Sequence, residues 1–99
     1  MFTATTDQIT EWKDKFGDVI RIKSKKYDKS AYYRKPTRTE MEYLSSGNQT
    51  SGLKFNAALL KACYLDGDKE IETKDDIFMG IGEEIMALLT FDEVEVEKL

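Results

Sequence analysis

Pro36 is the only proline in the chain, and it stands between two patterns that limit how the chain can fold. Before it, residues 19–23 and 31–34 are rich in β-branched and aromatic side chains, and their short polar connection makes an antiparallel hairpin the simplest arrangement. Proline has no amide hydrogen to donate to a strand ladder, so it ends the second strand. After it, Thr37 and Glu40 have the spacing of a capping box. The sequence therefore predicts an α+β fold in which a hairpin leads directly into helices.

A short helix is predicted before the hairpin. Residues 5–7 are Thr-Thr-Asp, whose side chains suit the N-cap of a helix. Ile9, Trp12 and Phe16 then recur at spacings of three and four and share one helical face. Gly17 is a natural stop, because glycine favours the residue just after a helix.

Two further helices are predicted after the proline. The first begins at the capping box and is interrupted at 45–48, where Gly47 or Asn48 suits a left-handed cap. The second covers 51–65, because its apolar residues recur on one face. A turn is expected over 66–69, which is Asp-Gly-Asp-Lys.

The last part of the chain is predicted to be helical and then acidic. Apolar residues over 77–89 recur at helical spacing, and Gly80 and Gly82 are expected to split this helix in two. Beyond it, residues 93–97 alternate glutamate and valine. This stretch is expected either to pair with the basic edge of the hairpin or to belong to a flexible acidic tail over 92–99.

Length and charge limit the organisation of the chain. Its 99 residues suit a single domain, 1–99, with a short N-terminal helix, an antiparallel β-hairpin and three or four packed helices. The net charge of −4 hides a division, since 19–38 carries eight basic residues and only one acid. Residues 66–99 carry twelve acids and three lysines. Segments of opposite charge attract each other within one fold or between copies.

The residue types that catalysis needs are scarce. The chain has no histidine and one cysteine, which excludes the usual zinc site and a Cys–His nucleophile pair. Gly80-Ile81-Gly82 lacks the third glycine of a dinucleotide loop. The acidic stretch 66–70 does not continue as a calcium loop, because Ile77 stands where a bidentate glutamate is needed. Cys63 is expected to be buried and inert. We therefore expect no catalytic residue, no metal, no cofactor and no enzyme.

The hairpin is one of two candidate binding surfaces. Basic side chains neutralise phosphates and tyrosines stack on bases, so nucleic-acid binding is an alternative function. The overall acidity of the chain opposes it, and a solvated strand face guarded by lysines explains the same residues. The candidate basic surface consists of Arg21, Lys23, Lys25, Lys26, Arg34, Lys35 and Arg38.

The order of these patterns resembles a known family. A helix ending in Lys15-Phe16-Gly17 is followed by a strand and then by Ala-Tyr-Tyr-Arg-Lys-Pro-Thr-Arg-Thr-Glu at 31–40. This layout resembles the small tail assembly chaperones of tailed bacteriophages, which often carry an aromatic-Arg-Lys/Arg-Pro-Thr segment at a strand-to-helix junction. The likeness covers most of the chain in layout, whereas only 31–40 matches as a motif.

The resemblance implies a non-enzymatic protein that binds the tape-measure protein, or another tail protein, and keeps it soluble. It also implies oligomers and a location in the cytoplasm of the host cell, and the apolar stretches are too short to cross a bilayer. A second alternative is an acidic inhibitor of a host protein, in which 66–97 imitates phosphates. The candidate surface for a client protein is apolar, although a helix core explains it equally well; it consists of Phe78, Met79, Met86 and Leu89.

Overall fold

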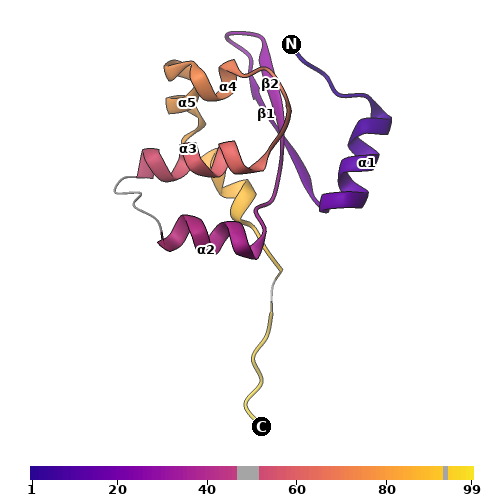
Figure 1. Cartoon of the computed structure of the whole chain (residues 1–99), viewed down its shortest axis with the longest axis vertical. Coiled ribbons are helices and arrows are strands. Elements are labelled where there is room, and N and C mark those ends of the chain that lie inside the picture. Colours follow the sequence, from indigo (N-terminus) through magenta and orange to yellow (C-terminus); the bar gives the residue numbers. More distant parts are fainter. Residues whose placement is uncertain (47–51, 93) are drawn as a thin grey trace.

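The computed structural model describes residues 1–46, 52–92 and 94–99. Its elements are, in chain order, α1 (Thr6–Phe16), β1 (Val19–Ser24), β2 (Lys29–Arg34), α2 (Arg38–Ser46), α3 (Gly52–Cys63), β3 (Tyr64–Gly67), α4 (Glu70–Thr73), α5 (Asp75–Ile81) and the 3₁₀ helix η1 (Gly82–Leu89) (Figure 1). This order confirms the predicted α+β class, with a short N-terminal helix, an antiparallel hairpin and packed helices after it.

The sheet is antiparallel and has the order β1-β2-β3, so β2 is central. The third strand corrects the prediction of a helix over 51–65 followed by a turn over 66–69, because α3 ends at Cys63 and Tyr64–Gly67 pairs with β2. Gly67 makes this pairing possible: with φ of 138°, a Cβ atom there would lie 2.5 Å from the Cα atom of Ala31. No side chain larger than hydrogen fits at that crossing.

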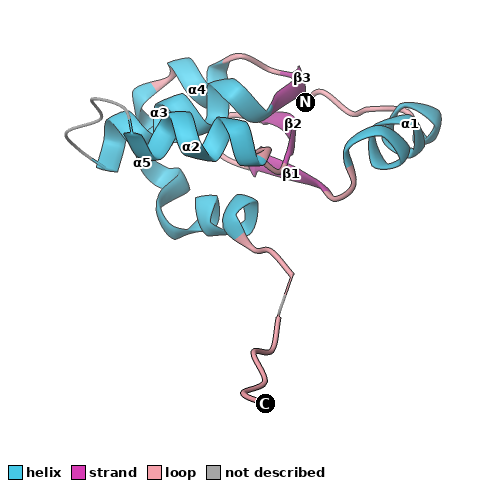
Figure 2. Ribbon diagram, turned by 60° about the horizontal axis from the view of Figure 1, so that its bottom comes forward, coloured by secondary structure: helices cyan, strands magenta, loops and turns pink. Residues whose placement is uncertain are grey.

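The sheet lies between α1 on one side and the remaining helices on the other (Figure 2). On the helical side, Tyr33 is fully buried and its ring meets that of Tyr64 edge-on, with centroids 5.9 Å apart. On the other side, Tyr32 packs against Trp12 with ring centroids 5.6 Å apart. The main core lies on the helical side and includes Ala31, Tyr33, Leu44, Leu59, Leu60, Cys63, Ile71, Ile77, Ile81, Ile85 and Leu88.

The predicted helix ends are largely confirmed. Thr5 caps α1 in a capping box with Gln8, and Gly17 ends the helix with φ of 84°. At the start of α2, Thr37 and Glu40 exchange hydrogen bonds between side chain and backbone, as the capping box requires. The left-handed cap expected at Gly47 or Asn48, and the start of the second helix at 51, lie outside the described residues.

The C-terminal part is divided at a glycine, as predicted, and residues 94–99 do not form the strand that was one of the two expectations for this stretch. Gly82, with φ of 48°, separates α5 from η1, so the predicted splitting of the last helix is confirmed. Residues 94–99 are all exposed and form no strand. Figure 1 shows them leaving the body of the molecule on the side opposite the β1–β2 turn. The acidic segment therefore does not pair with the hairpin of its own chain in this structure.

The segment before α1 is tied to the sheet by Asp68. One carboxylate oxygen of Asp68 accepts hydrogen bonds from the amides of Phe2 at 3.1 Å and Ser30 at 2.9 Å. The fully buried Ser30 donates its hydroxyl to the carbonyl of Phe2, and the amide of Ala4 donates to the Tyr32 hydroxyl at 3.2 Å. These bonds also lower the pKa of Asp68, because backbone amides stabilise the carboxylate.

Candidate functional site

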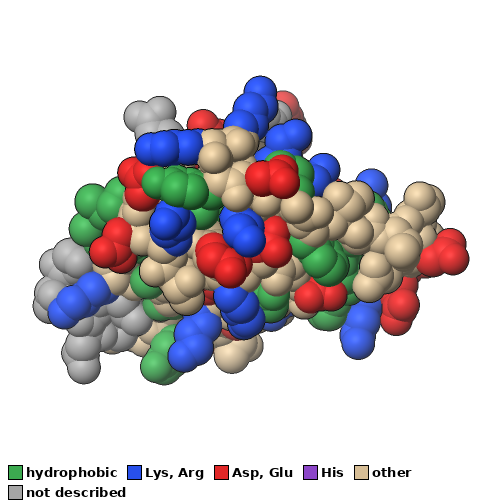
Figure 3. All heavy atoms as spheres, turned by 90° about the horizontal axis from the view of Figure 1, so that it is seen from above, with side chains coloured by type: hydrophobic (Ala, Val, Ile, Leu, Met, Phe, Trp, Pro, Cys, Tyr) green, Lys and Arg blue, Asp and Glu red, His purple; other side chains and the backbone are tan. Residues whose placement is uncertain are grey.

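Most of the predicted basic surface is neutralised within the chain. Four of its seven cations form ion pairs, which join Arg34 to Glu40, Lys35 to Asp18, Lys26 to Asp76, and Arg38 to Glu42. Arg21, Lys23 and Lys25 form no ion pair with another described residue. The space-filling view accordingly shows basic and acidic side chains interspersed on one face (Figure 3). The remaining uncompensated cations lie on β1 and on the turn that follows it.

The predicted apolar surface is divided by the fold. Phe78 and Leu89 are partly buried against the core, whereas Met79 is 60% and Met86 58% exposed. Gly82 breaks the helix between the two methionines, so they do not lie on one continuous helical face. The four residues do not form a single apolar stripe.

The structure instead forms a groove where the two predicted surfaces meet, between β1 and the α5–η1 segment. We call it the β1 groove. It consists of two hollows of about 300 and 440 Å³, which share Ile22, Lys23, Gly80 and Glu84 in their linings. The larger hollow is lined by four consecutive strand residues, 20–23, whose side chains alternate between the two faces of the sheet. The groove therefore follows the outer edge of the strand rather than one of its faces.

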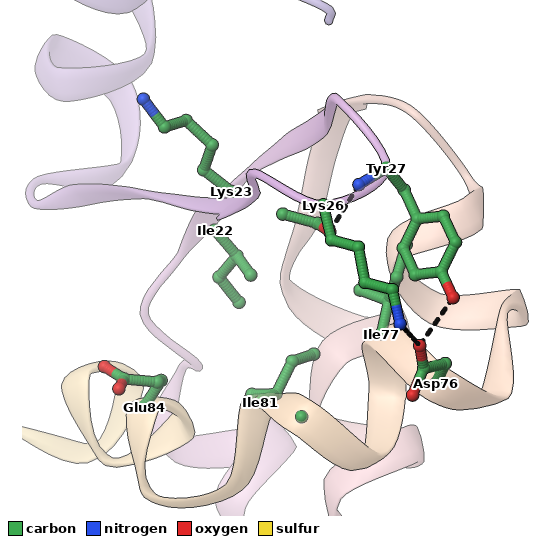
Figure 4. Close-up of a pocket in the computed structure, with 10 residues that line it drawn as sticks. Ile22, Lys23, Lys26, Tyr27, Asp76, Ile77, Ile81 and Glu84 are labelled. Carbon is green, nitrogen blue, oxygen red and sulfur yellow. Dashed lines mark hydrogen bonds and ion pairs between the residues drawn. The ribbon is translucent and has the colours of Figure 1, made fainter.

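The floor of the β1 groove is apolar. Figure 4 shows Ile22 pointing into the groove above Ile81, with Ile77 further along α5. Lys23 points away from the floor in the same view, and Glu84 lies at the η1 end. Apolar side chains thus line the bottom, and charged side chains stand on the rim.

One end of the groove is closed by a hydrogen-bonded cluster around Asp76. Its carboxylate accepts a 2.5 Å hydrogen bond from the Tyr27 hydroxyl and a 3.2 Å bond from Lys26 (Figure 4). These donors lower the pKa of Asp76, and the carboxylate in turn raises the pKa of Lys26. The ammonium group of Lys74 stands 4.4 Å from the centre of the Tyr27 ring. The cluster holds the β1–β2 turn against α5.

The outer edge of β1 is open along the groove. β1 pairs only with β2, and among the described residues no other backbone or side-chain group is hydrogen-bonded to the backbone of β1. An edge strand of this kind presents a row of free amide and carbonyl groups, which pair readily with another extended chain. The arrangement suits the binding of a peptide segment.

A third hollow, of about 540 Å³, lies apart from the β1 groove, between α2 and α3. Tyr43, Leu44, Ala58 and Ala62 supply most of its apolar wall, and Tyr43 is 71% exposed. Unlike the β1 groove, it offers no open strand edge to a partner.

The sequence pointed to the basic residues of the groove, Arg21, Lys23 and Lys26, but not to its apolar floor. Gly80, expected only to weaken a helix or to belong to an incomplete phosphate loop, lines both hollows, and a Cβ atom there would meet nothing within 4 Å. Ile22 and Ile81 lie far apart in sequence, and no local pattern joins them. The alternation of isoleucine with Arg21 and Lys23 was the one available signal, since it marks a strand with one apolar side.

Three findings bear on other kinds of site. Comparisons with protein-family models, with curated proteins and with solved structures find no match to this chain. Among the described residues, no group of three acidic, cysteine or histidine side chains is placed to hold a metal ion. Within the same residues, every helix is too short or too polar to cross a membrane.

Proposed function

We propose that this chain is a non-enzymatic protein-binding domain that takes up an extended segment of a partner along the β1 groove. The observation that carries the proposal is the open edge of β1 beside an apolar floor. Main-chain hydrogen bonds to the edge supply affinity, and side-chain pockets at alternate positions supply specificity.

The charges on β1 define the partner segment more closely. Arg21 and Lys23 are exposed and stand on the side of the strand opposite Ile20 and Ile22. A segment that alternates apolar and acidic residues matches both sides at once. A polyanion without apolar groups uses only half of this surface, which is why a protein segment is favoured over nucleic acid.

The resemblance of the chain to tail assembly chaperones of tailed bacteriophages supplies a particular partner. We propose the tape-measure protein, held in the cytoplasm of the infected cell until the tail tube forms around it. The exposed Met79 and Met86 add apolar contact area on the two elements that form the far wall of the groove.

Co-expression with the tape-measure protein of the same genome tests this proposal. The chain is expected to co-purify with it. Gly80→Gln is expected to abolish co-purification, because it adds a long side chain at a position that lines both hollows and where a Cβ atom meets nothing within 4 Å. The matched control is Gly52→Gln at the start of α3, where a Cβ atom also meets nothing within 4 Å.

Two outcomes count against the proposal. Absence of co-purification with any tail protein removes the assembly role. If Tyr43→Glu abolishes binding and Gly80→Gln does not, the hollow between α2 and α3 is the binding site instead.

A further inference from the structure

Residues 94–99 have a pattern that suits the open edge of β1. They read Val-Glu-Val-Glu-Lys-Leu, so in an extended chain Val94 and Val96 share one side and the two glutamates the other. The fold leaves these valines unburied, at 77% and 94% exposed. Figure 2 shows the segment running from the end of η1 away from the sheet. It is a strand-like sequence without a strand partner in its own chain.

β1 carries the complementary pattern. Ile20 and Ile22 are partly buried against the core, while Arg21 and Lys23 are exposed and form no ion pair with a described residue. The alternation of apolar and basic residues in β1 therefore complements the alternation of valine and glutamate in the segment.

One antiparallel register joins opposite charges on one side of the strand and leaves Lys98, opposite Ile20, as the single charge of the segment on the other side. It places Glu95 opposite Lys23 and Glu97 opposite Arg21. The same register places Val96 opposite Ile22, on the side of the groove. Directly opposite residues have Cβ atoms about 4.5–5.5 Å apart, which allows ion pairs on one face and apolar contact on the other.

Pairing of β1 with the β1 of another copy is disfavoured. An antiparallel pair about a twofold axis keeps each side chain on its own face, so in the two registers that overlap most of the strand Arg21 stands opposite Arg21 or Lys23. Like charges directly opposite each other destabilise a sheet. The edge of β1 therefore selects an acidic strand.

We propose that residues 94–99 of a second copy add to β1 as an antiparallel fourth strand, so that the chain forms a dimer by mutual exchange of these segments. The inference rests on the proposed function, because the same groove receives the strand. A second copy is favoured over the same chain because the segment leaves the body on the side opposite the β1–β2 turn (Figure 1). In the dimer the segment competes with the client.

Charge reversal at each side of the interface tests the dimer by sedimentation across a range of concentrations. Glu95→Lys with Glu97→Lys, and separately Arg21→Glu with Lys23→Glu, are each expected to weaken dimerisation at least about tenfold. An equimolar mixture of the two variants is expected to restore it, because both contacts of the mixed dimer regain opposite charges.

The control is Glu11→Lys with Asp14→Lys. It changes the net charge as the tail variant does, but it lies on exposed positions of α1, and it is expected to leave dimerisation unchanged. Circular dichroism establishes that each variant is folded.

The outcomes separate this inference from the proposed function. A wild-type chain that stays monomeric, a dimer insensitive to both reversals, or a mixture that fails to associate overturns the exchange. If the tail variant still captures the tape-measure protein, the proposed function survives that result. If the chain forms the strand-exchanged dimer as expected but captures no tail protein, the proposed function is contradicted and the inference of strand exchange is not.

Discussion

Arg34 donates two hydrogen bonds to the carboxylate of Glu40, at 2.7 and 2.9 Å, and thereby joins the end of β2 to the first turn of α2. Glu40 also accepts a bond from the amide of Thr37, so the capping residue and the ion-pair partner are the same side chain. The arginine reaches further, to the carbonyl of Ala62 at 2.9 Å. A residue that the sequence placed on a basic surface instead links three elements of the fold.

Replacing Glu40 tests the strength of this link. Hydrogen bonds from Arg34 hold the pKa of Glu40 at about 2, so the stabilisation is complete above about pH 4.5 and is lost as pH falls toward 2. Glu40→Gln is expected to lower the free energy of unfolding by about 2–3 kcal/mol at pH 7. Urea unfolding at pH 7 and pH 2.5 measures both effects, and the difference between wild type and variant shrinks at the lower pH.

Glu42→Gln is the control for this change. Its partner Arg38 is exposed and the pair lies on the surface of α2, so little effect on stability is expected. If Glu42→Gln and Glu40→Gln lower the free energy of unfolding by the same amount, Glu40 has no special role in stability.

Tyr33 and Tyr64 form a matched pair for a test of buried hydroxyl groups. The Tyr33 hydroxyl is buried and forms no hydrogen bond of ordinary geometry with a described residue; burial, and after it the nearby Glu72 carboxylate, raises the pKa of Tyr33. The Tyr64 hydroxyl, in contrast, donates to the Gly67 carbonyl at 2.8 Å. Tyr33→Phe is expected to leave stability unchanged or to raise it by up to about 1 kcal/mol, while Tyr64→Phe lowers it by about 1 kcal/mol. Thermal unfolding of both variants measures these two changes in stability. A Tyr33→Phe chain as unstable as Tyr64→Phe means that the hydroxyl has a partner.

Alanine substitution is expected to destabilise the fold at Gly67 and to stabilise it at Gly80. A Cβ atom at Gly67 would lie 2.5 Å from the Ala31 Cα atom and 2.6 Å from the Ser30 carbonyl oxygen. Gly67→Ala is therefore expected to cost more than about 2 kcal/mol by separating β3 from β2. Gly80→Ala lies in a helix with open space around it, and a gain of about 0.5–1 kcal/mol is expected. Denaturant unfolding measures both, and a well-tolerated alanine at 67 contradicts the pairing of β3.

Cys63 reports on opening of the core. Its side chain is fully buried, and burial raises the pKa of the thiol to about 11 from an ordinary value of 9.0. Because only the thiolate reacts, labelling by a disulfide reagent at pH 8 is expected to be at least about a hundredfold slower than in the urea-unfolded chain. Rapid labelling in native buffer contradicts the buried position.

Features that depend on neighbours in sequence could be predicted. The capping box of Thr37 and Glu40, the stop at Gly17 and the break at Gly82 each follow from local backbone chemistry. β3 could not, because Tyr64 and Leu65 continue the apolar pattern of α3. Their strand conformation is set by pairing with β2, which is a long-range effect.

The candidate site was predictable only in its parts. The alternation in β1 and the weakness of α5 at Gly80 were both visible, but their meeting in one groove depends on tertiary packing. The ion pairs show the same limit, since Lys26 and Asp76 are 50 positions apart. Sequence counts therefore overstated the basic character of the hairpin, because they do not reveal which cations find an acid.

The Asp68 carboxylate accepts hydrogen bonds from the amides of Phe2 and Ser30. These bonds affect the order in which parts of the chain can fold during synthesis. The Phe2–Asp68 bond spans 66 positions, so during synthesis on the ribosome this bond cannot form until Asp68 has emerged. The hairpin can form earlier, but without β3 both of its edges are open to other nascent chains. A pause in translation before Asp68 has left the ribosome would lengthen that interval, and a pause after its emergence would not.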